Sequence, residues 1–206
     1  MQADLFTLEW NGQTVVLKDV TARPLWMRLA WGRWTLRREA TGMIAAEGLP
    51  GVPRVLARVG RDAILLEMIP GCTLAKTDSP PVEYFDRLSA LMEALHQRGV
   101  AHGDLRRTNL MIDEQGRPYV LDFASAVVMR SGVWGFIWRW VYRSCVRIDQ
   151  SKVARLKASY YPDALTIAEV EAIENPPWFL QVGHFLKRHI FPHWQKLFKH
   201  GNARRH

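Results

Sequence analysis

The feature that most constrains this chain is a polar segment at residues 102–109 that is followed, thirteen residues after its end, by Asp122. The hydrophobic runs 109–112 and 119–121 are typical of short strands, and residues 113–116 (Asp-Glu-Gln-Gly) supply a turn. A hairpin brings the start of its first strand close to the end of its second. We therefore expect three oxygen-bearing side chains to lie near one another: Asp104, Asn109 and Asp122. Such a set suits Mg²⁺, which takes few protein ligands and completes its shell with water and substrate phosphates.

The composition sets limits on the class of protein. With 206 residues, of which 48% are hydrophobic, the chain is long enough for one compact unit or two small lobes. Two cysteines are too few for a disulfide framework or a zinc site. The first residues lack the pattern of a signal peptide, and no run reaches the ~18 apolar residues that span a bilayer. These features predict a cytoplasmic protein.

The charge of the chain is unevenly distributed. Residues 1–129 hold 15 Lys and Arg against 15 Asp and Glu, whereas residues 130–206 hold 13 against 5. The whole excess of +8 therefore lies in the last part of the chain. That part is also rich in tryptophan, and Arg139, Arg143 and Arg147 recur at a spacing that places them on one helical face. Basic and aromatic residues together favour an anionic membrane surface or nucleic acid as partner.

The remaining patterns predict secondary structure. Residues 4–10 and 14–20 form a predicted hairpin around Asn11-Gly12, and a second antiparallel pair is expected at 52–59 and 63–69. A helix is expected over Arg33 to Glu47, since a glycine- and proline-rich loop follows it. Another helix should follow Pro80-Pro81, and a capping box at Thr166 to Glu169 should open a short one.

The pattern His-x-Asp-x4-Asn followed by Asp-Phe resembles the catalytic and metal loops of the protein-kinase-like superfamily. Over about residues 5 to 128 the chain resembles short bacterial kinases of the lipopolysaccharide-core type (heptose or Kdo kinases) and RIO-type atypical kinases. The His-Gly-Asp form is also similar to that of aminoglycoside-phosphotransferase-like enzymes.

The resemblance implies an α+β, two-lobed kinase-like fold, with a minimal N-lobe of one antiparallel sheet and one helix and a reduced, mostly helical C-lobe. The expected boundaries are 1–69 for the N-lobe, 70–129 for the catalytic core and 130–206 for the basic, Trp-rich part.

The same resemblance implies roles for individual residues. Asp104 would orient or deprotonate the attacking hydroxyl, and Arg106 would stabilise the transferring phosphoryl group. Lys18 would neutralise phosphate charge, held by Glu39 or by its rival Glu47. The backbone of the connector would bind the adenine edge of ATP, at Glu67, Met68 and Ile69. Mg²⁺ would be held by Asn109 and Asp122. His102 is interpreted as a brace of the loop and not as a base.

The chain also departs from the kinase pattern. No Gly-x-Gly-x-x-Gly precedes Lys18, where only Gly12 is found, and Ala124 takes the place of the glycine in the metal motif. No long activation segment follows Asp122, so control through such a segment is not expected. A catalytically weak, nucleotide-binding pseudokinase module is therefore an alternative to an active enzyme.

The resemblance predicts an ATP- and Mg²⁺-dependent kinase that acts on a hydroxyl of a small molecule or glycolipid at the inner membrane surface. The alternative enzyme is a RIO-like Ser/Thr protein kinase, whose basic tail would contact an acidic partner or RNA. Tryptophan between arginines favours the membrane interpretation, since indole prefers the interface and arginine the anionic headgroups. We accordingly expect residues 130–206 to make peripheral contact with anionic membrane.

Overall fold

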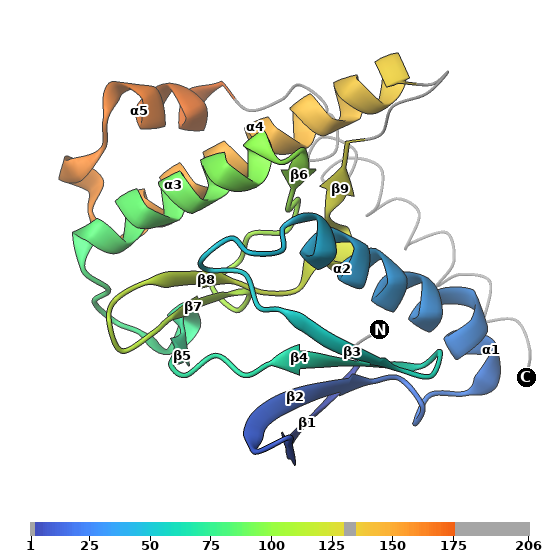
Figure 1. Cartoon of the computed structure of the whole chain (residues 1–206). Helices are drawn as coiled ribbons and strands as arrows, with labels where there is room; N and C mark the ends of the chain where they lie inside the picture. Colours follow the sequence, from blue (N-terminus) through green and yellow to red (C-terminus); the bar gives the residue numbers. More distant parts are fainter. Residues whose placement is uncertain (1–2, 130–134, 176–206) are drawn as a thin grey trace, which may run out of the picture.

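A computed structural model of the chain describes residues 3–129 and 135–175. Its N-terminal part is an antiparallel sheet and its C-terminal part is mainly helical, so the fold class is α+β (Figure 1). Residues 130–134 and 176–206 of the basic, Trp-rich segment, including Trp178 and Trp194, lie outside the described residues.

The N-terminal sheet has four strands in the order β1-β2-β4-β3. The strands are β1 (Asp4–Trp10), β2 (Gln13–Asp19), β3 (Val55–Val59) and β4 (Ala63–Glu67). Asn11 and Gly12 both have positive φ, at 50° and 73°, as the tight turn between β1 and β2 requires. Both predicted hairpins are therefore present, and β2 lies in the interior of the sheet, where it pairs with β1 and β4.

One helical stretch follows the first hairpin and covers one face of the sheet (Figure 1). It consists of α1 (Leu25–Met27), a π-helical turn η1 (Arg28–Gly32) and α2 (Arg33–Ala45). The predicted helix over 33–47 is confirmed within two residues at its end, but helical structure begins eight residues earlier than expected. Leu36, Ala40 and Met43 are buried at helical spacing, and they form the face of α2 that packs into the core.

The middle of the chain supplies one long helix and short strands. After β5 (Cys72–Thr73) and a 3-10 turn η2 (Leu74–Lys76), α3 (Val82–Gln97) runs through the core. The side chains that hold it there are buried at the predicted positions Phe85, Leu88, Leu91, Met92 and Leu95. The short strands β6 (Val100–Ala101), β7 (Leu110–Ile112), β8 (Pro118–Val120) and β9 (Val127–Val128) follow, with a 3-10 turn η3 (Phe123–Ser125) before β9.

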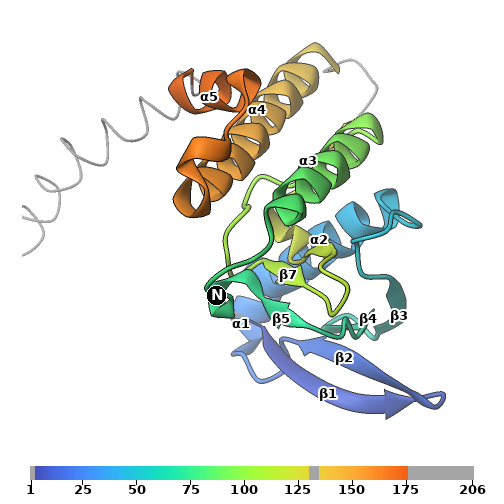
Figure 2. The ribbon, with the colours of Figure 1, turned by 90° about the vertical axis from the view of Figure 1, so that its left-hand side faces the viewer.

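The C-terminal part is built on α4 (Gly135–Tyr160), which packs beside α3 (Figure 2). A 3-10 turn η4 (Pro162–Ala164) leads to α5 (Ile167–Glu174), which opens with the predicted capping box of Thr166 and Glu169. Lys157 on α4 is buried, and its ammonium contacts the carboxylates of Asp86 and Glu169 at 3.1 Å each. This ion-pair group ties α3, α4 and α5 together. Within 3–129 and 135–175, no helix is both long and apolar enough to cross a membrane.

Candidate active site

The first half of the site is an ion pair beneath α2. The ammonium of Lys18, on β2, lies 2.7 Å from a carboxylate oxygen of Glu39 on α2. Glu39 is buried, and Glu47, its rival in the sequence, is exposed beyond the end of the helix. The expected Lys18–Glu39 pair is therefore present. Because one buried partner without the other would be an uncompensated charge, breaking this pair should cost about 3–5 kcal/mol.

Asp122 joins this pair from the C-terminal part of the chain. One of its carboxylate oxygens lies 3.3 Å from the ammonium of Lys18. Burial lowers the pKa of Lys18, but the carboxylates of Glu39 and Asp122 outweigh it and leave the pKa above its ordinary value. Burial raises the pKa of Glu39 in spite of the ammonium beside it. Lys18 is thus a fixed positive charge at the junction of the two parts of the molecule.

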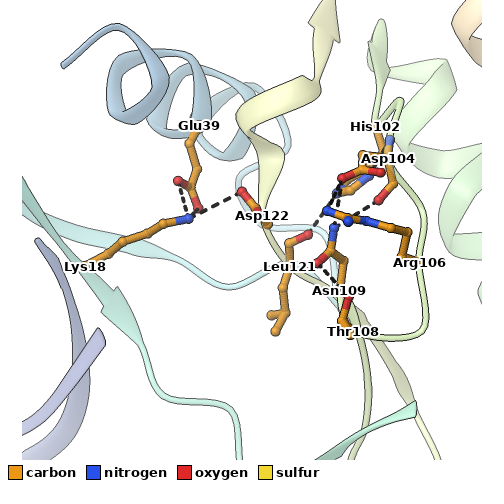
Figure 3. A network of polar contacts seen from close by, with 9 residues as sticks. All are labelled: Lys18, Glu39, His102, Asp104, Arg106, Thr108, Asn109, Leu121 and Asp122. Atoms are coloured by element: carbon orange, nitrogen blue, oxygen red, sulfur yellow. Dashed lines mark hydrogen bonds and ion pairs between the residues drawn. The ribbon is translucent and has the colours of Figure 1, made fainter. Parts of the chain in front are cut away.

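Asp122 owes its position to the hairpin and to an unusual backbone conformation. Leu110 pairs with Val120 across β7 and β8, so the end of β8 lies beside the start of β7. Asp122 follows with a φ of 62°, in the left-handed region that non-glycine residues rarely occupy. Such conformations persist where the surrounding structure enforces them and are concentrated at functional sites. This turn directs the carboxylate toward Lys18 (Figure 3).

His102 is buried within the loop 102–109. Its ring packs edge-on against Phe123, with centroids 4.9 Å apart, and Nε2 lies 2.9 Å from the carbonyl oxygen of Leu121. Nδ1 lies 3.3 Å from the backbone N–H of Asp104, which can only donate. The neutral tautomer with its proton on Nε2 satisfies both contacts. Burial lowers the pKa of His102, which favours this neutral form. The geometry agrees with a brace.

The rest of the loop orients Asp104. Its carboxylate accepts a hydrogen bond from Arg106 at 2.6 Å, and the side-chain amide of Asn109 donates to the backbone carbonyl of Asp104 at 3.0 Å. Gly103 has a φ of 78°, and a side chain there would meet the carbonyl oxygen of Ser125 at 3.0 Å. That close approach accounts for glycine between His102 and Asp104.

Figure 3 shows Asp122 between the Lys18–Glu39 pair and the group formed by Asp104, Arg106 and Asn109. The two groups are joined through the backbone, since the N–H of Leu121 donates to the carbonyl of Asn109 at 2.8 Å. The structure thus brings together six of the residues singled out in the sequence: Lys18, Glu39, Asp104, Arg106, Asn109 and Asp122.

The connector residues lie at the end of β4. Ile69 is buried and Met68 is 41% exposed, while the carboxylate of Glu67 faces Arg54 at 3.3 Å. Because the side chain of Glu67 is engaged with Arg54, a role in binding adenine would fall to the backbone of this segment. That role stays a prediction.

Gly12 lies far from this site. Lys18 pairs with Leu5, near the open end of the first hairpin, and Gly12 is in the turn at the other end. Gly12 lies six positions before Lys18, which corresponds to roughly 20 Å along a strand. Gly12 therefore serves the turn and does not contact phosphates placed at Lys18.

Asp149, on α4, is a site residue that the sequence patterns did not reveal. Its buried carboxylate accepts the backbone N–H of His102 at 2.7 Å and that of Gly103 at 2.8 Å, and it contacts Nε2 of His96 at 3.1 Å. The loop before Asp104 is thereby fixed to α4. A carboxylate at a buried helical position requires such partners. Asp149 lies seven residues after Tyr142 and four before Val153, so helical spacing puts it on the same face as two apolar residues, and the sequence gives no motif beyond this spacing.

The donor set fits Mg²⁺ on chemical grounds. Asn109 and Asp122 offer an amide oxygen and a carboxylate that is 40% exposed. Among the residues that the structure describes, no three His, Cys, Asp or Glu side chains cluster as a closed metal cage. Mg²⁺ in phosphotransfer sites uses one or two carboxylates together with substrate phosphates, and so needs no such cage. That Asn109 and Asp122 hold the ion stays a prediction.

The model of the phosphotransferase enzyme family (APH) matches residues 17–130, which is more than half of the chain. The chain therefore belongs to this family, and its sheet and helices are consistent with a kinase-like fold. The matched region contains every residue of the site described above except Asp149.

Parts of the chain are also similar to protein kinases. CBL-interacting protein kinase 16 of Oryza sativa subsp. japonica is 37% identical over 102 residues, which cover 45% of this chain and 22% of that kinase. Serine/threonine-protein kinase grp of Drosophila melanogaster is 43% identical over 47 residues, or 23% of this chain and 9% of that kinase. The chain thus spans less than a quarter of the length of these relatives.

Proposed function

We propose that this chain is an ATP- and Mg²⁺-dependent kinase that transfers the γ-phosphoryl group to an alcohol hydroxyl. The observation that carries the proposal is the single polar network that joins Lys18 and Glu39, through Asp122, to the loop of Asp104. Family membership supports phosphotransfer. The network supplies a fixed cation for phosphate and a carboxylate for the acceptor.

The chain's own residues divide the work. Lys18, held by Glu39, offsets phosphate charge, and Asn109 and Asp122 would hold Mg²⁺, which neutralises phosphate charge when bound. Asp104, whose side chain is 32% exposed, can be reached by an acceptor hydroxyl and would orient it and take its proton. Arg106 now neutralises Asp104 and is exposed, so it is free to turn toward the transferring group.

The first acceptor that we propose is the hydroxyl of serine or threonine in a protein. The support is that the relatives matched in part are named as protein kinases, one of them as a serine/threonine kinase. The catalytic requirement is the same for any alcohol, since the loop of Asp104 needs only a hydroxyl within hydrogen-bond reach.

The second acceptor is a small molecule or a glycolipid at a membrane surface. It is favoured by the exposed apolar side chains of Phe136 and Ile137 at the start of α4, with the exposed Arg139 and Arg143 beside them. Such a surface suits peripheral contact between residues 130–206 and anionic membrane. The variant Arg139→Glu/Arg143→Glu should lose this contact and keep nucleotide binding.

The deciding experiment incubates the purified chain with Mg²⁺ and ATP labelled at the γ-phosphate, together with either a mixture of unfolded proteins or a glycolipid extract. Label in protein bands supports the first acceptor, and label in the lipid phase supports the second. Asp104→Ala serves as the control in both. If wild type binds ATP but transfers label to neither acceptor nor to water, the pseudokinase alternative replaces the proposal.

A further inference from the structure

A second surface of the molecule combines exposed aromatic side chains with unpaired arginines. It lies on the helical stretch α1–η1–α2. The large apolar side chains on this stretch that are 47% to 70% exposed are Leu25, Trp26, Leu29, Trp31 and Trp34. We call them the aromatic face. Exposed apolar groups gathered on one element, with polar residues beside them, mark contact sites for proteins or membranes.

The aromatic face is rigidly held. Trp31 and Trp34 pack against each other with ring centroids 5.4 Å apart, and the guanidinium of Arg38 lies 4.7 Å above the ring of Trp34. Asp62, in the turn between β3 and β4, pairs with Arg33 at 2.7 Å and also with Arg28. These ion pairs fasten the helical stretch to the sheet, so the exposed side chains are presented on a fixed framework.

Beside the aromatic face is a cavity of about 180 Å³ that three arginines line: Arg37, Arg58 and Arg61. We call it the arginine pocket. Arg37 lies one helical turn after Trp34, and Arg61 precedes Asp62, which pairs with Arg33 of the helix. Asp62 therefore fixes the arginine pocket and the aromatic face relative to each other.

The arginines of the pocket differ from most others nearby. In the N-terminal part, Arg23, Arg28, Arg33 and Arg54 each pair with a carboxylate. Within the described part of the chain, the guanidinium groups of Arg37, Arg58 and Arg61 have no ion pair or hydrogen bond. Like charges gathered around one cavity repel each other, and a phosphate group that accepts from several guanidinium donors relieves this repulsion.

We propose that the aromatic face and the arginine pocket together form a docking surface for an anionic, phosphate-bearing membrane. The pocket takes a lipid phosphate, while the indoles and leucines of the aromatic face enter the interface. Nucleic acid would use the arginines but gives Leu25 and Leu29 nothing apolar to contact. The surface contains none of the residues of the candidate active site, so it is a separate site. It also differs from the basic segment 130–206.

The test is co-sedimentation of the full chain with phosphatidylcholine vesicles that contain or lack phosphatidylglycerol. Wild type should bind only the anionic vesicles, and salt should release it because exposed charges are screened within about 8 Å. Arg58→Glu/Arg61→Glu should weaken binding by at least roughly twenty-five-fold, since each arginine near an anionic surface contributes about a factor of five. Lys76→Glu/Arg87→Glu makes the same change in net charge at exposed positions outside both this surface and the segment 130–206, and should have a much smaller effect.

A second pair of variants tests the aromatic face. Trp26→Ala/Leu29→Ala should weaken vesicle binding, whereas Phe6→Ala, which removes an exposed aromatic side chain from β1, should not. All variants should bind nucleotide as wild type does, and this measurement is the control for correct folding. Failure of phosphotransfer would therefore count against the proposed function and leave this proposal intact.

Three results would overturn the proposal. The first is vesicle binding that Arg58→Glu/Arg61→Glu leaves unchanged while Arg139→Glu/Arg143→Glu abolishes it. The second is a wild-type chain that ignores anionic vesicles and instead binds single-stranded RNA or a phosphopeptide through the arginine pocket. The third is a pocket that binds glycerol 3-phosphate in solution without any binding to vesicles, which would assign it to a soluble phosphate ester.

Discussion

Substitution of Asp149 by asparagine should loosen the loop that carries Asp104. It should not create a cavity, because the two side chains have nearly the same size and shape. The carboxylate accepts two backbone N–H groups, from His102 and Gly103, and contacts His96. An asparagine side chain has one oxygen, so its NH₂ group must face one of these donors. One buried N–H then loses its acceptor, and the other donates to a neutral amide oxygen where it had donated to a carboxylate. Together these changes should lower the free energy of unfolding by roughly 2–3 kcal/mol.

For a chain of 206 residues this cost corresponds to a fall in the melting temperature of roughly 5–10 °C, as measured by circular dichroism. The loop should also shift, and a misplacement of about 1 Å at the reacting groups lowers turnover roughly 10²-fold. ATP binding should change little, because Lys18 and Glu39 are not bonded to Asp149. Asp163→Asn, at an exposed position, is the matched control. If Asp149→Asn melts within about 1 °C of wild type and keeps its turnover, Asp149 does not hold the loop.

Three further predictions concern the site itself. Asp104→Ala should lower phosphotransfer roughly 10²–10⁴-fold while ATP binding persists, and unchanged turnover would refute its role. Asp122→Asn should weaken Mg²⁺-dependent nucleotide binding more than Asp113→Asn, whose carboxylate is engaged with Arg117 in the β7–β8 turn; equal Mg²⁺ titrations would mean that the metal site is misplaced. Because burial lowers the pKa of His102, its contribution to stability is complete above about pH 6.5 and declines as the pH falls below that value. Urea unfolding at pH 7.5 and 5.5 should show this decline in wild type and a smaller one in His102→Asn.

The elements that depend on local chemistry could be predicted from the sequence. The hairpin that presents Asp122 follows from its turn residues and its short apolar runs, and α3 follows from the helical spacing of its buried side chains. The pairing of Lys18 with Glu39 is not local. It was expected only because the order of motifs resembled that of a kinase.

Other features depend on contacts that no local pattern encodes. Asp149 bonds to residues 46 and 47 positions earlier in the chain, and its neighbours in sequence give no motif. Asp62 lies between the two predicted strands 52–59 and 63–69, yet it also fastens the helical stretch to the sheet through Arg28 and Arg33. The early start of that stretch was missed for a related reason. Helices are predicted from apolar residues that recur on one face and are buried there, whereas the tryptophans and leucines of this stretch are exposed.

The long helix α4 carries both the exposed apolar and basic residues of the proposed membrane contact and Asp149, which holds the loop of Asp104. Its first turns carry the exposed Phe136, Ile137 and Arg139, and Asp149 lies thirteen residues beyond Phe136, or roughly 20 Å along the helix. Because α4 is one continuous helix, a displacement of its first turns would be transmitted to the hydrogen bonds that Asp149 makes with the loop of Asp104. Contact at the start of α4 would therefore act on turnover and not on the Lys18–Glu39 pair. This coupling predicts that anionic vesicles raise the kcat of wild type and leave its affinity for ATP unchanged. In Asp149→Asn the vesicles should no longer raise kcat.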